Sequence, residues 1–550
     1  MAGLADAFDL IGEAIEHRLP VMHTPGIALA VTDGHEILGV VVRGFADAAS
    51  GTPVRPETRF QIGSISKGFA GMIAVAESEA GRLDLHQPVT DILPWLEIPQ
   101  PFGPITMHHL MTHSSGLHAG TEDAPTGLGA AWQLRETPPT FPPGERFWYS
   151  NDAWKVAGLV LEHVTGTPIQ DLLRERIFGP LRMTATEGAI TDETRLHLAT
   201  GYLPLYSDRP ARLDHPLVQA NWLLSNTADG SIVSNVIDMS AYVRLLLGGG
   251  RLPGDGPDPV VSAGAFEILT TPHIDDPDSP GFGYGYGFWA GEHGGVRSIW
   301  HSGGMVGYKA YLKVQPERGL GCVILQNGMG NRRDLAEYAL NVVNEATRGA
   351  ALVAMRYPPA STDIPNGADY TGTFTADDGR TFEVAIEGPS LRYREGPVGV
   401  LLERDPLGEI TDTFLLPHPS LDFHALRFGR DDAGAVVEAF HGGHWFRGSA
   451  WKGPEPAPHP AEWEAYPGLY RSDDPWSPVM VVSLRKGVLT LEWPLDNEDS
   501  AGELTPLEDG WFAVGETWMP KRIRFERMVQ AKTIMAVFNA GRWHRSFEDQ

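Results

Sequence analysis

The chain has 550 residues, well beyond the roughly 250–300 residues at which single hydrophobic cores stop growing, so two or three domains are expected. A content of 42% hydrophobic and 21% charged residues is typical of a folded globular protein and excludes a disordered chain. The formal net charge of −27 argues against nucleic acid and anionic membranes as partners, because their phosphate groups would repel that field.

The first residues, MAGLADAFDLIGEAIEHRL, have apolar positions at helical spacing and an acidic balance. They lack the basic start and the continuous apolar core of a secretory signal. No window approaches the roughly 20 apolar residues of a membrane span. A cytoplasmic protein is therefore expected, although removal of a signal would leave the same picture. The single cysteine, Cys322 in GCVILQN, is expected to be a buried strand residue.

From the N-terminus to about residue 350, strand-like and helical segments are mixed. Residues 26–47 predict two strands with a turn at Asp33-Gly34, and residues 66–85 predict a helix with a break at Gly81. Further helices are predicted at 153–166, 238–250 and 335–349, and further strands within 298–328. Strands at both ends of a helical middle predict one sheet whose edges come from opposite ends of this region, together with a helical subdomain.

After residue 350 the composition changes to linkers and short alternating strands. Residues 351–366 and 453–461 have the proline-rich character of linkers. The segments that follow them, 367–452 and 462–550, repeat each other: YTGTFTADD corresponds to YPGLYRSDD, and FHGGHWFRG corresponds to FNAGRWHRS. We therefore expect two homologous antiparallel β domains, each a small closed barrel, after a first domain of residues 1–350.

A serine and a lysine three residues apart, Ser64 and Lys67, lie in FQIGSISKGFA. On a helix, roughly 5–6 Å would separate their Cβ atoms, so the lysine amine could take the serine proton. The strand-like RFQIG before Ser64 and the apolar helical pattern after it favour this setting. The same spacing at 449–452 and 483–486 lies in β-rich sequence and is interpreted as structural. By itself the pair leaves a catalytic and a structural role equally open.

Tyr149 and Asn151 stand in PPGERFWYSND, a loop that precedes a predicted helix. One interpretation is structural: the aromatic residues pack the loop down and Asn151 caps the helix. The other is functional: a phenol beside a lysine ammonium loses its proton more easily and acts as a general base, while the asparagine binds a substrate amide.

His301, Gly303 and Gly304 begin the segment HSGGMVGYKAYL, which leads directly into a predicted strand. Small residues here let a substrate backbone lie against the strand and leave its N–H groups free to bind an oxyanion. His-x-Gly also occurs elsewhere in the chain, so the pattern is weak when taken alone.

In chain order, Ser64-x-x-Lys67, Tyr149-x-Asn151 and His301-x-Gly303 resemble the three motifs of the penicillin-recognising serine hydrolases, which include class C β-lactamases, D,D-peptidases, D-aminopeptidases and esterases. The segments ITMHHLMTHSSGL, IFGPLRMTAT and ADGSIVSNVIDMSAYVRLLL are also similar to this family, and the resemblance covers roughly residues 10–350. It implies an α/β fold class: an antiparallel sheet flanked by helices, with an all-α subdomain, followed by two lipocalin-like antiparallel β-barrels. It also implies a covalent acyl-enzyme.

The resemblance implies a catalytic set, Ser64, Lys67, Tyr149 and His301, and a substrate-binding set, Asn151, Gly303 and Gly304. The serine would be the nucleophile and the lysine would share or relay its proton. The tyrosine would act as general base and then as acid to the leaving group. The N–H groups of Ser64 and Gly304 would form the oxyanion hole, and His301 occupies the third-motif position.

One position departs from the β-lactamases, which usually carry lysine where this chain has His301. Histidine there is a feature of D-aminopeptidases and of some esterases and peptidases of the family. A D-aminopeptidase of the family also resembles the whole layout, with two related barrels after the catalytic domain. In that relative a loop of the last barrel reaches the active site. The acidic PLDNEDSAGE at 494–503 is the matching candidate here, suited to a substrate α-ammonium, with a solvated surface turn as the alternative.

The histidine-rich HHLMTHSSGLH spaces His109 and His113 like a zinc pair. The glutamate of His-Glu-x-x-His is absent, however, and the segment matches the family, so no metal is expected. GYGYG lacks the spacing of a phosphate-binding loop. No cofactor is expected.

Together these observations predict a serine hydrolase that cleaves amide bonds of small peptides or amino-acid amides, most concretely an aminopeptidase or D-aminopeptidase. A carboxylesterase or a β-lactamase-like hydrolase would use the same residues. The alternative of another class is a catalytically silent protein that binds peptides or β-lactams. The expected partner is a small molecule or a short peptide, and a homo-oligomer is compatible with the sequence.

Overall fold

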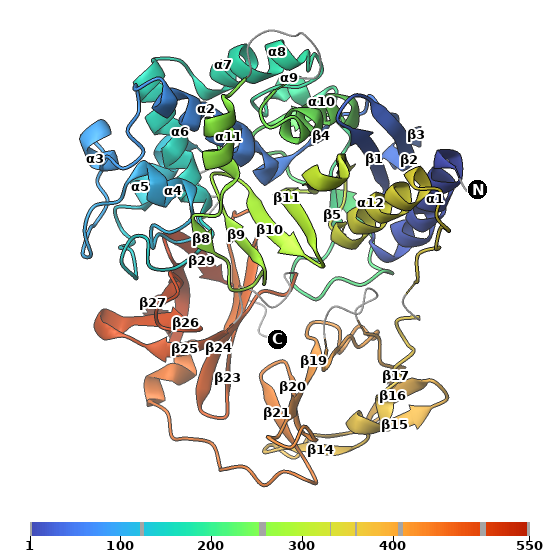
Figure 1. The fold of residues 1–550 in the computed structure, drawn as a ribbon. Coiled ribbons are helices and arrows are strands. Elements are labelled where there is room, and N and C mark those ends of the chain that lie inside the picture. The colour runs from blue at the N-terminus through green and yellow to red at the C-terminus, as the bar shows by residue number, and fades with distance from the viewer. Residues whose placement is uncertain are drawn as a thin grey trace. The chain divides into compact units, whose positions relative to one another are not determined.

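The computed structural model describes residues 3–120, 126–251, 260–330, 332–357, 360–404, 411–495 and 502–546. The chain divides into two compact units, which Figure 1 shows with their elements labelled. The first unit comprises Met1–Leu203 and Leu217–Met355, and the second comprises Pro204–Pro216 and Arg356–Gln550. The polypeptide therefore crosses between the units three times, after residues 203, 216 and 355.

The first unit is built on a nine-stranded antiparallel sheet with the order β3-β2-β1-β13-β12-β11-β10-β9-β8. Its strands are β1 (Gly26–Asp33), β2 (Ile37–Asp47), β3 (Thr52–Pro53), β8 (Ile274–Asp275), β9 (Phe282–Tyr284), β10 (Trp289–His293), β11 (Val296–Met305), β12 (Tyr308–Gln315) and β13 (Leu320–Gln326). β1 pairs with β13, with Ile27 opposite Gln326 and Asp33 opposite Leu320. This pairing confirms that the sheet joins strands from opposite ends of the region.

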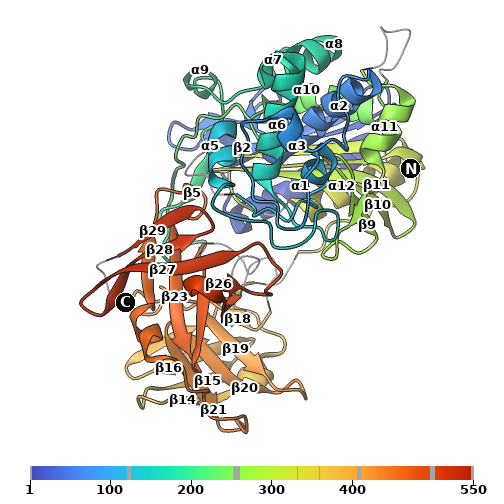
Figure 2. The ribbon, with the colours of Figure 1, turned by 90° about the vertical axis from the view of Figure 1, so that its left-hand side faces the viewer.

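Helices cover both faces of this sheet, which is why β1 and β13 are almost continuous apolar runs. α1 (Leu4–Val21) and α12 (Arg333–Thr347) pack together on one face, and α10 (Val236–Leu247) packs on the other (Figures 1 and 2). Neighbouring residues of β13 show the two faces: Cys322 is affected by the charge of Glu337 on α12, whereas a Cβ on Gly321 would meet Val243 of α10.

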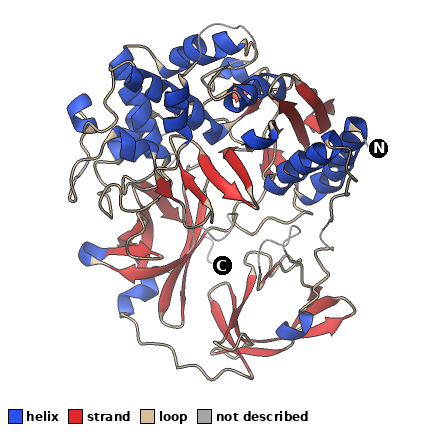
Figure 3. Cartoon of the chain, in the orientation of Figure 1, coloured by secondary structure: helices blue, strands red, loops and turns tan. Residues whose placement is uncertain are grey.

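A mainly helical region lies between the paired short strands β4 (Phe60–Gln61) and β7 (Val233–Ser234). Its helices are α2 (Ser66–Glu79), α3 (Val89–Ile92), α4 (Met107–Met111), α5 (Gly127–Gln133), α6 (Asn151–Thr165), α7 (Ile169–Leu173), α8 (Gly179–Leu181) and α9 (Asp192–Arg195), with the single turns η1 (Gly63–Ile65) and η2 (Arg174–Phe178). α11 (Ala263–Thr270) follows and packs on α2. Figure 3 shows this separation of helices and strands. The α/β fold with a helical subdomain predicted from the sequence is confirmed.

The second unit contains an eight-stranded antiparallel sheet with the order β17-β16-β15-β14-β21-β20-β19-β18. Its strands are β14 (Gly372–Ala376), β15 (Thr381–Glu387), β16 (Ser390–Glu395), β17 (Val398–Leu401), β18 (Thr413–Phe414), β19 (Leu426–Arg430), β20 (Val436–His441) and β21 (His444–Gly448). A single bridge, Glu403 to Leu415, follows β17 and β18. Within the described part of 367–452 this sheet is a half-barrel whose two edges are joined by that one bridge, so the predicted antiparallel β domain is confirmed but its closure is not continuous.

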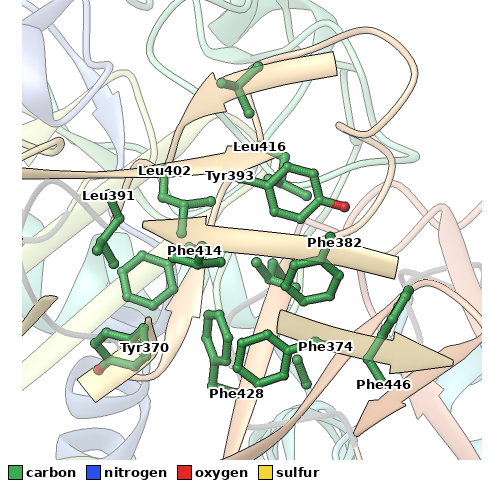
Figure 4. Packing of buried hydrophobic residues seen from close by; sticks show 14 of the residues in the cluster. Tyr370, Phe374, Phe382, Leu391, Tyr393, Leu402, Phe414, Leu416, Phe428 and Phe446 are labelled. Atoms are coloured by element: carbon green, nitrogen blue, oxygen red, sulfur yellow. The ribbon is translucent and has the colours of Figure 1, made fainter. Parts of the chain in front are cut away.

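Aromatic residues fill the concave side of this half-barrel (Figure 4). Phe374 stacks on Phe382 with ring centroids 5.1 Å apart, and Phe382 stacks on Tyr393 at 4.9 Å. These residues come from three successive strands and alternate with exposed or partly exposed neighbours, as expected for a sheet with one buried face. At about 25 cal/mol for each Å² of apolar surface buried, such side chains supply most of the stabilisation of a small sheet.

The strands of residues 468–545 form a closed antiparallel barrel in which the first strand also pairs with the last. They are β22 (Gly468–Arg471), β23 (Val479–Arg485), β24 (Val488–Glu492), β25 (Gly502–Pro506), β26 (Trp511–Val514), β27 (Arg522–Val529), β28 (Lys532–Phe538) and β29 (Gly541–Arg545). The two repeated tryptophans, Trp445 and Trp543, lie on the last strand of the half-barrel and of the barrel. The two repeated segments thus share the same order of strands, and the strands of the second segment form a closed barrel.

Residues 204–216 belong to the second unit although both of their flanks belong to the first. They leave the strand β5 (Tyr202–Pro204) and return through β6 (Leu217–Gln219), which form a two-stranded sheet. Arg209 binds Asp422 of the half-barrel at 3.0 Å, and Arg471 of the barrel binds Asp208 at 3.1 Å. We call residues 204–216 the inserted segment. The sequence analysis did not predict it.

In the described part of the chain, no helix is both long and apolar enough to cross a bilayer.

Candidate active site

Ser64 lies in the turn η1, between the end of β4 and the start of α2. Gly63 precedes it with a φ of +53°, a conformation that glycine adopts readily and other residues rarely do. The turn continues into α2 without a break, because Ile65 and Ser66 already have helical dihedral angles. Ser64 is therefore presented at the start of a helix, where backbone N–H groups have no partner within the helix.

Lys67 is in the first turn of α2 and is fully buried. Its Nζ donates to Ser64 Oγ at 2.9 Å, to Asn151 Oδ1 at 2.8 Å and to the main-chain carbonyl of Asp229 at 2.9 Å. Because an ammonium group has three donors, these three acceptors orient it fully. The Ser-x-x-Lys spacing thus brings the lysine amine within hydrogen-bonding distance of the serine oxygen, as the sequence predicted.

Asn151 is the first residue of α6, and Ser150 is its N-cap. The Oγ of Ser150 accepts a hydrogen bond from the N–H of Ala153 at 3.1 Å. The structural alternative in which Asn151 caps this helix is therefore wrong. Because its neighbour does the capping, the amide of Asn151 is left to accept from Lys67.

Tyr149 is held in an aromatic stack beside the lysine. Its ring stacks on His113 with centroids 4.1 Å apart and on Trp289 at 5.9 Å, and Lys67 Nζ lies 5.0 Å from its centroid. Burial raises the pKa of the Tyr149 phenol, while its interaction with the Ser64 hydroxyl opposes that shift and the charge of Asp229 adds to it. The phenol is therefore protonated in the resting protein.

His301 is a buried residue of β11 that is kept neutral. Burial and the nearby charge of Lys67 lower the pKa of His301 to about 3, although a hydrogen bond with the Ser302 carbonyl opposes the shift. Since a carbonyl oxygen only accepts, Nδ1 carries the proton and donates to Ser302. Nε2 then accepts from the hydroxyl of Tyr284 at 2.9 Å. Both ring nitrogens are occupied by protein groups.

Gly303 and Gly304 bring β11 against the turn that carries Ser64. A Cβ on Gly303 would lie 1.9 Å from the carbonyl oxygen of Ile62, and a Cβ on Gly63 would lie 2.5 Å from the nitrogen of Gly304. No side chain fits between these backbones, so glycine is required on both sides. The close approach places the main-chain nitrogen of Gly304 next to the turn that carries Ser64.

All seven predicted site residues lie in the first unit and meet around this turn: Ser64, Lys67, Tyr149, Asn151, His301, Gly303 and Gly304. The sequence analysis weighed His113 only as a metal ligand and not as the residue that stacks on the tyrosine, and it missed Asp229, whose carbonyl binds the lysine. It also missed Tyr284, the partner of His301. A signal for His113 existed in THSSGL, but nothing marked Asp229, because a main-chain acceptor has no residue signature.

The two histidines with zinc-like spacing face different partners. His109 Nδ1 accepts from the N–H of Thr106 at 3.2 Å, whereas His113 Nδ1 accepts from the N–H of Ser150 at 2.9 Å. Within the described ranges no group of three or more potential ligand side chains could hold a metal ion. For the acidic segment 494–503, residues 496–501 lie outside the described residues, so its proposed reach to the active site stays a prediction.

Comparison with known proteins identifies one matching family. The family model described as Beta-lactamase matches residues 13–346. This range contains all seven residues of the candidate site.

Individual relatives match at low identity. The chain is 26% identical over 373 residues to penicillin-binding protein 4 of Amycolatopsis lactamdurans, covering 65% of this chain and 94% of that protein. It is 23% identical over 333 residues to protein flp of Staphylococcus aureus strain N315, covering 58% of this chain and 63% of that protein. Among solved structures, the octameric penicillin-binding protein homologue from Pyrococcus abyssi has a TM-score of 0.58 at 23% identity and covers 80% of this chain and 99% of its own.

Proposed function

Because the chain belongs to the Beta-lactamase family, we propose that it is a serine hydrolase that cleaves amide bonds of small peptides or amino-acid amides through an acyl-enzyme on Ser64. The observation that carries the proposal is the buried Lys67, which hydrogen-bonds both Ser64 Oγ and Asn151 Oδ1 beside the Tyr149 phenol. A lysine with a purely structural role would not need a partly exposed serine hydroxyl and a neutral amide as its partners. A lysine that activates a serine nucleophile must lie within hydrogen-bonding distance of that hydroxyl.

The arrangement supports a two-step reaction. The Lys67–Tyr149 pair first gives up one proton to solvent, and Ser64 Oγ then attacks the substrate carbonyl carbon while its own proton passes to the vacated position on the pair. The oxyanion that forms is bound by the N–H groups of Ser64 and Gly304. The pair returns the proton to the leaving amine, the C–N bond breaks, and an ester on Ser64 remains. Water then attacks this ester and the same groups move its proton.

The neutral state of His301 bears on the substrate class. A lysine at this position, as in most β-lactamases, offers a cation for a substrate carboxylate. His301 is uncharged at neutral pH and both its nitrogens are occupied. The site therefore lacks this means of binding a carboxylate, which favours substrates that carry none next to the scissile bond. Amino-acid amides, peptides cleaved at their N-terminus and simple esters meet this condition.

The charge of Asp229 adds a preference within that class. Its carboxylate accepts a hydrogen bond from Thr227 at 2.5 Å and acts electrostatically on Tyr149. A negative group close to the acyl-binding residues favours a cation in the substrate, and the free α-ammonium of an aminopeptidase substrate supplies one. This supports an aminopeptidase of either stereochemical preference over a carboxylesterase.

A mass measurement tests the nucleophile. Incubation with a fluorophosphonate, followed by intact-mass analysis, is expected to add one phosphonyl group to the wild type and none to Ser64→Ala. The variant Ser483→Ala is the matched control, because its serine has the same Ser-x-x-Lys spacing on strand β23. If wild type and Ser64→Ala are labelled equally, or neither is labelled, the hydrolase proposal fails.

A substrate panel tests the class. D- and L-alanine p-nitroanilide are compared with their N-acetyl forms and with p-nitrophenyl butyrate. Faster hydrolysis of the free amines supports the aminopeptidase. Hydrolysis confined to the butyrate ester would replace it by a carboxylesterase, and a preference for the N-acetyl forms would exclude recognition of an α-ammonium.

We also propose that the protein is a homo-oligomer. The octameric state of the Pyrococcus abyssi homologue supports this. Light scattering after size-exclusion chromatography is expected to give a multiple of 59.9 kDa. A single monomeric peak at micromolar concentration would contradict it.

A further inference from the structure

Arg332 is half-buried and directs its guanidinium at the backbone of the strand that carries Gly303 and Gly304. It immediately precedes α12, and its side chain reaches the β11–β12 pair. Its Nε donates to the carbonyl of Ala310 at 2.9 Å, and one terminal nitrogen donates to the carbonyl of Gly303 at 3.3 Å. Gly303 and Ala310 are opposite each other in the strand register, so one guanidinium binds both strands at the same level.

Within the described ranges, no carboxylate forms an ion pair with this group, which binds main-chain carbonyls instead. Burial lowers the pKa of Arg332 to about 10, which still leaves it protonated at neutral pH. Among the described residues, no carboxylate contributes to that shift. Burying a cation without a counter-ion is costly, so the carbonyl groups that receive it must be strongly polarised in return.

The geometry of the peptide bond links this cation to the nucleophile. The Gly303–Gly304 peptide is trans, so its C=O and N–H groups point in opposite directions. The C=O of Gly303 is directed at Arg332. The N–H of Gly304 therefore points the other way, on the side where the Gly304 nitrogen abuts Gly63 and the Ser64 turn.

We propose that Arg332 is a positioning residue that orients and polarises the Gly303–Gly304 peptide, so that the N–H of Gly304 becomes a stronger and better fixed donor to the oxyanion. The inference rests on the proposed hydrolase function. A hydrogen bond to the carbonyl of an amide draws electron density from its N–H and strengthens the hydrogen bond that the N–H donates. The effect acts on the transition state, where negative charge develops on the substrate oxygen, and not on the neutral ground state.

A purely structural role is the competing explanation, since Arg332 also joins α12 to the sheet. The two roles differ in what they predict. Loss of a structural tie lowers thermal stability and reduces binding of all ligands in proportion. Loss of oxyanion polarisation lowers the affinity for a tetrahedral, negatively charged adduct and lowers kcat, while the KM of a neutral ester changes little.

The experiment compares Arg332→Met and Arg332→Lys with Arg333→Met. The neighbouring Arg333 is exposed and its guanidinium lies 5.1 Å from the Trp300 ring centroid, which makes it the matched control. The probe is 1-aminoethylboronic acid, which forms a tetrahedral adduct with a serine hydroxyl. Its affinity is measured by titration calorimetry, and kcat and KM are measured with p-nitrophenyl butyrate.

We expect Arg332→Met to lose about tenfold in boronate affinity and in kcat, with KM changed less than twofold, because full removal of an oxyanion donor costs about 10²–10³. Arg332→Lys, which keeps the charge but loses the fork of donors, should lie between. Arg333→Met should match the wild type. Unchanged boronate affinity in a folded Arg332→Met, or an equal loss in Arg333→Met, would overturn the inference.

Two further results separate the possible failures. If Arg332→Met does not fold, the comparison of Arg332→Lys with Arg333→Lys decides: equal boronate affinities contradict the inference, and a selective loss in Arg332→Lys supports it. If wild-type protein forms no adduct with either the boronic acid or a fluorophosphonate, the hydrolase proposal itself fails, and the inference fails with it.

Discussion

Lys67 Nζ donates to Asn151 Oδ1 at 2.8 Å, although the two residues are 84 positions apart in the chain. The contact ties the first turn of α2 to the first residue of α6, and it exists because Ser150 caps α6 in place of Asn151. The lysine is thereby oriented toward Ser64 by a group from a different helix. The serine and the lysine share a helix, but the direction of the amine depends on the helical subdomain.

Replacing Asn151 by alanine should therefore slow acylation more than it weakens the fold. The lost hydrogen bond to a charged group is worth about 2 kcal/mol, or roughly thirtyfold in rate if it acts fully on the transition state. The measurement is the single-turnover rate of Ser64 labelling by a fluorophosphonate. The exposed Asn226 provides the control variant Asn226→Ala, and equal labelling rates for both variants would contradict this role of the Lys67–Asn151 contact.

Tyr149→Phe should separate amide from ester cleavage. The variant keeps the stack on His113 but removes the hydroxyl near Ser64. An amine leaving group needs a proton as the C–N bond breaks, whereas p-nitrophenolate leaves without one. Hydrolysis of alanine p-nitroanilide is expected to fall about 10²–10⁴-fold, and hydrolysis of p-nitrophenyl butyrate much less. Equal losses on both substrates would show that the phenol does not act on the leaving group.

Gly63→Ala should displace β11 from the turn that carries Ser64. The new Cβ would lie 2.4 Å from the carbonyl oxygen of Gly304, and the positive φ of Gly63 adds strain. We expect a cost of about 3 kcal/mol, seen as a lower melting temperature, together with loss of Ser64 labelling. Gly34→Ala is the control, because nothing lies within 4 Å of its Cβ position. Wild-type labelling and stability in Gly63→Ala would contradict the tight backbone contact.

His301 should make the protein less stable in acid. Its pKa is lowered to about 3 in the folded protein, while the unfolded chain titrates near 6.5. Below pH 6.5 the unfolded state therefore binds more protons, and stability falls as the pH drops from about 6.5 toward 3. Between pH 7 and pH 5 this residue should cost on the order of 2 kcal/mol.

The comparison with His301→Gln isolates this contribution. The unfolding free energy of the wild type should fall more steeply between pH 7 and pH 5 than that of the variant, because glutamine does not titrate. The exposed His197 provides the control variant His197→Gln, which should follow the wild type. Parallel profiles for wild type and His301→Gln would mean that His301 is not held neutral by its surroundings.

In this protein, contacts made by side chains could be predicted from the sequence better than contacts made by main-chain groups. Ser64, Lys67 and Tyr149 could be found because their side chains and spacing have chemical meaning. Asp229 was not predicted because it binds Lys67 through its main-chain carbonyl. Arg332 was not predicted because it donates to main-chain carbonyls, and such contacts have no characteristic residue pattern. Closure of the first β domain also lies beyond the sequence pattern. The repeat predicts the strand order of both domains, but the edges of the first are joined by the single bridge from Glu403 to Leu415.

The inserted segment 204–216 changes what a domain deletion in this chain removes. A chain cut after residue 355 keeps this segment but loses Asp422 and Arg471, the residues to which Arg209 and Asp208 are bound. In the remaining chain, the inserted segment would have lost the residues with which it forms these ion pairs. A self-sufficient catalytic fragment would have to omit both pieces and join β5 to β6 directly. The second unit therefore cannot be removed as residues 356–550 alone. Any exchange of this unit between related chains must include the inserted segment.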